Sequence, residues 1–138
     1  MTKEEVVDLI KDSGYGVLST ADGDQPKGRP MMPYLDDEGN LLLAVLPNSR
    51  TIEQVKKNPK VEMCYLDRKM WFARVTGMAK ISNDLDKKKQ VWANVPMLRQ
   101  YFSGPEDANL VLLEITTKSV EASTPHQKQP DILTSLKI

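Results

Sequence analysis

The sequence has very little cysteine and histidine, on which much protein chemistry depends. Its 138 residues include one cysteine, Cys64, and one histidine, His126. A single cysteine excludes a disulfide within the chain and a metal site built from several cysteines. A single histidine in a polar C-terminal segment argues against a serine–histidine–aspartate hydrolase. Cys64 lies in an alternating stretch typical of a strand, so we expect it to be packed rather than nucleophilic.

An excess of charge and a long apolar run are also lacking. The 19 basic residues balance 19 acidic ones, which argues against nucleic acid or a membrane surface as a partner. No apolar run is long enough to span a bilayer, and the first residues lack the apolar core of a signal peptide. We therefore expect a cytoplasmic protein with no nucleic-acid or membrane partner. The length fits a single domain over residues 1–138.

Short strands joined by tight turns are the main pattern of the chain. Thr2 and Glu5 form a capping box that predicts an N-terminal helix, residues 22–24 predict a hairpin turn, and Gly77 predicts a bulge in its strand. The expected strands are residues 15–21, 26–35, 41–46, 61–66, 70–81 and 110–116, and the later helices are 49–57, one opening at residue 83 or 84, and 96–102. Because no strand–helix–strand unit is present, the pattern favours an antiparallel sheet closed into a small barrel. The polar tail, residues 125–138, is expected to be loosely ordered unless it docks on a partner.

Two arginines are the strongest candidates for a binding site. We expect residues 26–35 to pair with residues 41–46, which places Arg29 opposite Leu46 and therefore near Arg50. Ser49 and the free N–H groups of the helix that follows would lie at the same point, where the helix dipole favours an anion. Guanidinium groups bind phosphate through paired hydrogen bonds. From these residues alone, the alternative that both arginines are solvated surface residues stays open.

The extended segment around Arg29 suggests a second part of the site. Three prolines between residues 26 and 33 cannot donate to a strand ladder, so sheet pairing there must be interrupted or have an open edge. A flat ring could lie along Met31, Met32 and Pro33, where backbone groups remain available to heteroatoms. The alternative is that these residues are only barrel core.

The chain resembles the pyridoxamine 5′-phosphate oxidase-like, FMN-binding split-barrel family, in its small stand-alone branch. The resemblance rests on several strings in a fairly specific order: GYGVLST at 14–20, GRPMM at 28–32, Ser49-Arg50 before a helix ending in NPKV at 58–61, VTGMA at 75–79, and the region from Trp92 to Gly104. It implies a mainly β fold with short helices, an antiparallel six-stranded split β-barrel of the FMN-binding type.

The resemblance also implies a cofactor, its site and a partner. FMN would lie at the subunit interface of a homodimer. The phosphate would be held by the Ser-Arg-Lys string and the flavin lined by the strand around residues 29–34 and its neighbour. The implied cofactor-binding residues are Arg29, Pro30, Met31, Met32, Pro33, Ala44, Val45, Ser49, Arg50 and Thr51. Thr51 departs from the family, which usually has lysine there, so one positive charge is missing.

The implied activity is that of an FMN-dependent oxidoreductase. True pyridoxamine phosphate oxidases carry a C-terminal Arg-x-His string that this chain lacks, so we do not expect oxidation of vitamin B6. Two alternatives stay open: a non-catalytic flavin-binding stress protein, and a split barrel that binds another cofactor such as F420 or haem.

Overall fold

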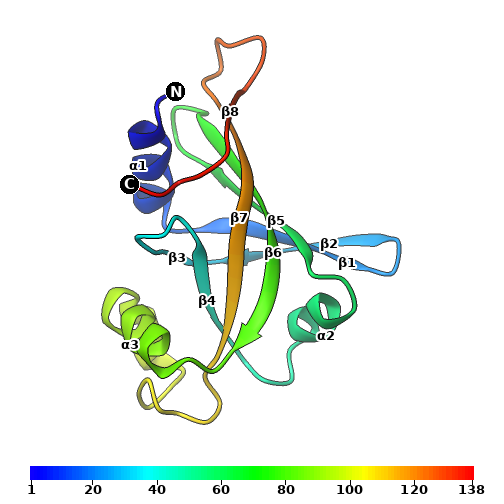
Figure 1. Ribbon diagram of the computed structural model, residues 1–138, viewed down its shortest axis with the longest axis vertical. Coiled ribbons are helices and arrows are strands. Elements are labelled where there is room, and N and C mark those ends of the chain that lie inside the picture. The colour runs from blue at the N-terminus through cyan, green and yellow to red at the C-terminus, as the bar shows by residue number, and fades with distance from the viewer.

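The computed structural model describes residues 1–138 as a curved antiparallel sheet with three short α-helices around it (Figure 1). The elements, in chain order, are α1 (Lys3–Ser13), β1 (Gly16–Asp22), β2 (Gln25–Met31), β3 (Tyr34–Leu35), β4 (Leu41–Val45), α2 (Arg50–Lys57), β5 (Lys60–Leu66), β6 (Phe72–Ser82), α3 (Leu85–Asn94), the 3₁₀ helix η1 (Pro96–Gln100), β7 (Val111–Ser123) and β8 (Asp131–Leu133). None of the helices is long and apolar enough to cross a membrane.

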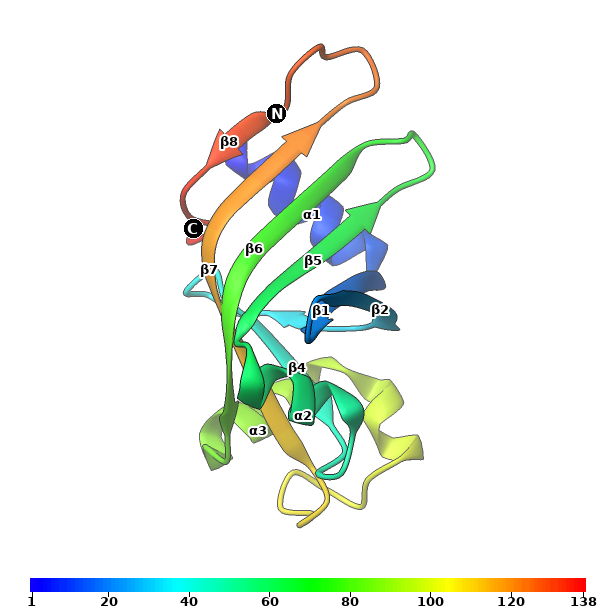
Figure 2. The same ribbon diagram turned by 90° about the vertical axis from the view of Figure 1, so that its right-hand side faces the viewer.

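The sheet is an open barrel, as the predicted fold class requires. Its strands follow the order β2-β1-β5-β6-β7-β4-β3, with β8 paired to β7 (Figure 2). The two ends of this path, β2 and β3, are consecutive in the chain and joined by Met32 and Pro33, yet they form no ladder with each other. Pro33 has no N–H to donate, which suits the position of the split. The structure has eight strands where six were expected. The two additional strands, β3 and β8, are short, with two and three residues.

The pairing of β2 differs from the expectation. β2 pairs along its whole length with β1, from Asp22 opposite Gln25 to Gly16 opposite Met31, and only Tyr34 and Leu35 pair with β4. Arg29 is therefore opposite Leu18, and the prediction that it lies opposite Leu46 is wrong. The physical reason is the tight turn at Gly23 and Asp24, which brings β2 back onto β1 before the prolines interrupt the strand.

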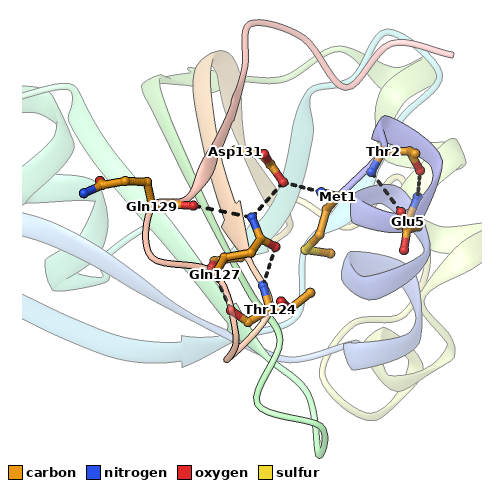
Figure 3. Close-up of polar contacts among 8 residues, drawn as sticks. Met1, Thr2, Glu5, Thr124, Gln127, Gln129 and Asp131 are labelled. Atoms are coloured by element: carbon orange, nitrogen blue, oxygen red, sulfur yellow. Dashed lines mark hydrogen bonds and ion pairs between the residues drawn. The ribbon is translucent and has the colours of Figure 1, made fainter.

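The local signals at α1 and Gly77 are confirmed. Glu5 N–H donates to Thr2 Oγ1 at 3.2 Å, and Thr2 N–H donates to the Glu5 carboxylate at 2.9 Å (Figure 3). The register of β6 against β7 shifts between Thr76 and Gly77. A Cβ on Gly77 would lie 2.5 Å from the carbonyl oxygen of Thr116, so the close approach of the two strands requires glycine.

Two apolar clusters lie on opposite sides of β4. The larger cluster has 23 buried residues and fills the barrel, where Leu41, Leu43 and Val45 point inward. The smaller cluster contains Leu42 and packs β4 and β7 against α3. Because β4 is covered on both faces, its sequence is a continuous apolar run rather than an alternating one. Helices α2 and α3 lie on opposite sides of this part of the sheet (Figures 1 and 2).

The C-terminal segment is packed where a loosely ordered tail was expected. Residues 131–133 form β8, and the Leu136 side chain is 2% exposed within the barrel cluster. Figure 3 shows the Gln127 side chain donating to Asp131, which also pairs with the amino group of Met1. Lys3 Nζ donates to the Lys137 carbonyl at 2.9 Å. These contacts attach the segment to α1.

Candidate functional site

A polar cleft of about 390 Å³ lies between the β1–β2 hairpin and helix α2. Four basic side chains and two acidic ones line it. The basic residues are Lys27, Arg29, Arg50 and Lys57, and the acidic ones are Asp22 and Glu53. The excess of positive charge makes this cleft suited to an anionic group.

Arg29 is held in the cleft by three oxygen atoms. Its Nη1 donates to the Leu18 carbonyl at 3.1 Å and to Thr20 Oγ1 at 2.9 Å. Its Nη2 donates to Gln54 Oε1 at 2.7 Å. The Thr20 hydroxyl in turn donates to the same Gln54 oxygen at 2.5 Å. The guanidinium is therefore fixed between β1 and α2, and it is only partly exposed.

All three acceptors of Arg29 are electrically neutral. The structure contains four ion pairs, and Arg29 belongs to none of them. Desolvation lowers the pKa of Arg29 from its ordinary value, but an arginine remains charged at neutral pH. A partly buried positive charge without a carboxylate partner is the strongest electrostatic feature of the cleft.

The first turn of helix α2 lines the same cleft as Arg29. Ser49 is the N-cap, and its Oγ accepts the N–H of Ile52 at 3.3 Å. The N–H groups of Arg50 and Thr51, in the first turn, have no acceptor within the helix. The positive end of the helix dipole therefore adds to the charge of Arg50.

An apolar pocket of about 290 Å³ lies further along β2. Twelve of its thirteen lining residues are hydrophobic. Pro30, Met31 and Met32 line one side, and Ala44 and Leu46 line another. Because Pro30 directly follows Arg29, strand β2 contributes to both the polar cleft and the apolar pocket, although the two hollows share no lining residue. This arrangement fits a ligand with an anionic end and an apolar body.

The predicted site residues are divided among five places. Arg29, Arg50 and Thr51 line the polar cleft, and Pro30, Met31, Met32 and Ala44 line the apolar pocket. Pro33 lines a neighbouring hollow with Tyr34 and Pro96. Val45 points into the barrel core, and Ser49 uses its hydroxyl as a helix cap.

The prediction missed Lys27, Gln54 and Lys57, which line the cleft, and Thr20, which contacts Arg29; periodicity could have found the first three. Lys27 lies two residues before Arg29, on the same face of β2. Gln54 and Lys57 follow Arg50 by four and seven residues, which places all three on one face of α2. Thr20 contacts Arg29 from β1, and finding it required the β1–β2 register.

His126 and Cys64 lie outside both hollows. His126 is exposed in the segment after β7 and lines neither the cleft nor the apolar pocket. Cys64 is partly buried on β5, where desolvation and then Glu62 raise the pKa of its thiol. A raised pKa leaves less of the reactive thiolate, in keeping with a packed side chain.

Sequence comparison assigns the chain to a family. The profile described as Pyridoxamine 5'-phosphate oxidase like matches residues 1–134. The chain belongs to the pyridoxamine 5′-phosphate oxidase-like family.

Individual relatives cover nearly the whole chain. General stress protein 26 of Bacillus subtilis (strain 168) is 26% identical over 132 residues, which span 93% of this chain and 92% of that protein. The crystal structure of General Stress Protein 26 from Bacillus anthracis str. Sterne is similar with a TM-score of 0.82 and 28% identity, covering 96% of this chain and 97% of that one.

More distant structures share the fold and differ in what they bind. An FMN-binding protein from Nostoc punctiforme PCC 73102, related to pyridoxamine 5′-phosphate oxidase, has a TM-score of 0.70 and 14% identity, covering 94% of this chain and 86% of that one. A heme-binding protein from Mycobacterium smegmatis has a TM-score of 0.77 and 14% identity, covering 97% of this chain and 58% of that one.

Proposed function

We propose that this protein binds FMN, with the phosphate in the polar cleft and the flavin ring in the apolar pocket. The observation that carries the proposal is the Arg29 guanidinium, held by neutral acceptors and lacking a carboxylate partner. A dianionic phosphate supplies the missing negative charge and accepts charge-assisted hydrogen bonds. Arg50 and the first N–H groups of α2 lie at the same cleft.

The missing lysine at position 51 does not leave the cleft short of positive charge. Thr51 is 6% exposed, so its side chain is largely enclosed. Lys27 from β2 and Lys57 from the last turn of α2 line the same cleft and bring two further ammonium groups. These lysines are more exposed than Arg29, and we assign them long-range attraction of the phosphate rather than a fixed contact.

The apolar pocket supports both the ring site and a homodimer. Its rim carries three large side chains that are unusually exposed: Tyr15 at 54%, Leu46 at 56% and Tyr101 at 67%. Exposed apolar side chains gathered around one hollow mark a surface that another molecule covers. We propose that a second copy of the chain covers this rim and encloses the flavin at the interface.

The proposed activity is that of a flavin-dependent oxidoreductase. Bound FMN supplies hydride or electron transfer at its ring. The chain binds and orients the cofactor and shields one side of the ring from water. Oxidation of pyridoxamine phosphate is not proposed, since the chain lacks the Arg-x-His string and its one histidine is remote from the cleft.

A titration of the purified protein with FMN and riboflavin tests the proposal. Riboflavin lacks the phosphate, so we expect FMN to bind about 10- to 100-fold more tightly. Flavin absorption after reconstitution and a rise in melting temperature should accompany binding. If FMN produces neither, or if riboflavin binds equally well, the assigned phosphate site is wrong.

A non-catalytic flavin-binding protein is the second candidate, favoured by the similarity to General stress protein 26. It predicts bound FMN without oxidation of NADH or NADPH, which a steady-state assay of the FMN-loaded protein measures. Competition by F420 or haem in the same titration tests the remaining cofactors. Haem is the weaker of the two because the exposed His126 lies outside the apolar pocket.

A further inference from the structure

Two buried polar side chains, Thr20 and Gln54, contact Arg29, and the proposed function gives neither of them a role. Thr20 is 4% exposed and Gln54 is 8% exposed. Polar side chains buried to this extent require hydrogen-bond partners. Here they find them in each other and in Arg29, since Gln54 Oε1 accepts from both the Thr20 hydroxyl and the guanidinium.

Whether residue 54 is neutral or negatively charged determines whether the positive charge of Arg29 remains available to a ligand. An arginine that is partly removed from water is commonly paired with a carboxylate, which holds its geometry and neutralises it. A glutamate at position 54 could make the same contact at the same length. Gln54 holds the guanidinium with an equally placed oxygen and leaves its charge intact.

The orientation of the Gln54 amide follows from its partners. The Thr20 hydroxyl donates to Gln54, and the guanidinium can only donate, so the amide oxygen must face both. Both hydrogen bonds of the Gln54 side chain are accepted by its amide oxygen, and Gln54 lines the polar cleft. These contacts leave the N–H₂ group of Gln54 as a donor for a ligand in the cleft.

We propose that Gln54 is a positioning residue that holds Arg29 through a neutral oxygen, so that the guanidinium keeps its charge for the anionic group of the ligand. This inference rests on the proposed phosphate site. Thr20 supports the arrangement by bridging Arg29 and Gln54 from strand β1. The cleft is thus built to present an arginine rather than to neutralise it.

The substitution Gln54→Glu tests the role of charge because it changes the shape of the side chain very little. The new carboxylate would pair with Arg29 and repel the phosphate. We expect FMN affinity to fall by about 10- to 100-fold while riboflavin affinity changes less than about threefold. Gln25→Glu is the matched control, since this substitution adds the same charge on the β1–β2 hairpin, at a residue that does not line the cleft.

The ratio of FMN to riboflavin affinity separates the possible results. If the wild-type protein shows no preference for FMN, the proposed phosphate site fails. If the wild-type preference persists in Gln54→Glu, the phosphate site stands and the role of Gln54 is overturned. A loss of affinity for both flavins indicates a structural defect and also counts against the positioning role.

Thr20→Val gives an independent test if Gln54→Glu does not fold. Valine matches the shape of threonine but removes the hydroxyl that accepts from Arg29 and donates to Gln54. We expect the FMN preference to fall by about three- to tenfold, because one of the three acceptors of the guanidinium is lost. An unchanged preference in a folded Thr20→Val protein overturns the proposal.

Discussion

The guanidinium of Arg29 and the side-chain amide of Gln54 are joined by a hydrogen bond of 2.7 Å, although Arg29 lies on the edge strand β2 and Gln54 on helix α2. The contact crosses strand β1, whose Thr20 bonds to both residues. It therefore ties the hairpin to the helix at the point where the polar cleft opens. An edge strand that loses its partners is free to move, so this contact also fixes the geometry of the proposed phosphate site.

Arg50→Ala should weaken FMN binding without affecting riboflavin. Arg50 lines the cleft at the first turn of α2, and removing a charged hydrogen-bond donor costs about 1.5–3 kcal/mol. Fluorescence titration of both flavins measures the change. Lys56→Ala is the control, because Lys56 is an exposed basic residue of the same helix that does not line the cleft. Equal FMN affinity in Arg50→Ala and wild type would move the phosphate elsewhere.

Tyr101→Asp should convert the proposed homodimer to a monomer. Tyr101 is 67% exposed on the rim of the apolar pocket, where a buried aspartate would meet the partner without a counter-charge. Analytical ultracentrifugation gives the oligomeric state. Ile132→Asp is the matched control, since Ile132 on β8 is 68% exposed but does not line this pocket. A monomeric wild-type protein, or a Tyr101→Asp dimer, would contradict the proposed interface.

The features that were predicted correctly depend on residues close together in the sequence. The capping box of Thr2 and Glu5, the turn after Asp22 and the bulge at Gly77 each follow from a few neighbouring residues. The apolar runs likewise predicted the positions of most strands. The antiparallel barrel then followed from the lack of strand–helix–strand units.

The features that were missed depend on which strand pairs with which. Residues 26–35 had a possible partner on each side, and their prolines indicated an interruption without locating it. The structure pairs Arg29 with Leu18 instead of Leu46. Arg29 and Arg50 nevertheless line one cleft, because the long Arg29 side chain reaches past β1 to α2. Docking of the C-terminal segment could not be predicted from its polar composition, since it depends on two apolar side chains, Leu133 and Leu136, and on the pairing of β8 with β7.

Gly39→Ala should destabilise the protein by displacing the C-terminal segment. Gly39 has a φ of +81°, and an added Cβ would lie 2.5 Å from the backbone nitrogen of Lys137. We expect the free energy of unfolding to fall by about 2–4 kcal/mol, because alanine is strained in the left-handed conformation and its Cβ clashes with the segment. Gly23→Ala is the control, because Gly23 has a φ of +62° and no atom within 4 Å of the added Cβ. Its expected cost is about 1 kcal/mol. Urea denaturation measures both variants. If Gly39→Ala and Gly23→Ala lose the same free energy of unfolding, the C-terminal segment is not tightly packed on Gly39.

Lys87→Met should reverse the direction in which Glu114 makes the stability of the protein depend on pH. Lys87 Nζ pairs with the Glu114 carboxylate, which is 10% exposed. Burial raises the pKa of Glu114, but hydrogen bonds from Lys87 and Ser82 outweigh burial and leave the pKa below its ordinary value. In the wild-type protein Glu114 therefore contributes stability above the pKa of an unfolded glutamate, and this contribution is lost as the pH falls through the lower folded pKa.

Without Lys87, the Glu114 carboxylate is buried and lacks its main partner, and the direction of the pH dependence should reverse. At neutral pH we expect Lys87→Met to lower the free energy of unfolding by about 1 kcal/mol. The loss is small because the Lys87 side chain is 38% exposed, so solvent screens its attraction to Glu114. As the pH falls, Glu114 takes up a proton and the deficit relative to wild type should shrink. The double variant Lys87→Met/Glu114→Gln removes the titrating carboxylate. At neutral pH the double variant should therefore be more stable than Lys87→Met, and the pH dependence of its stability should contain no contribution from residue 114. Urea denaturation at several pH values measures all three proteins. A deficit of Lys87→Met that is independent of pH would show that the pair does not control the ionisation of Glu114.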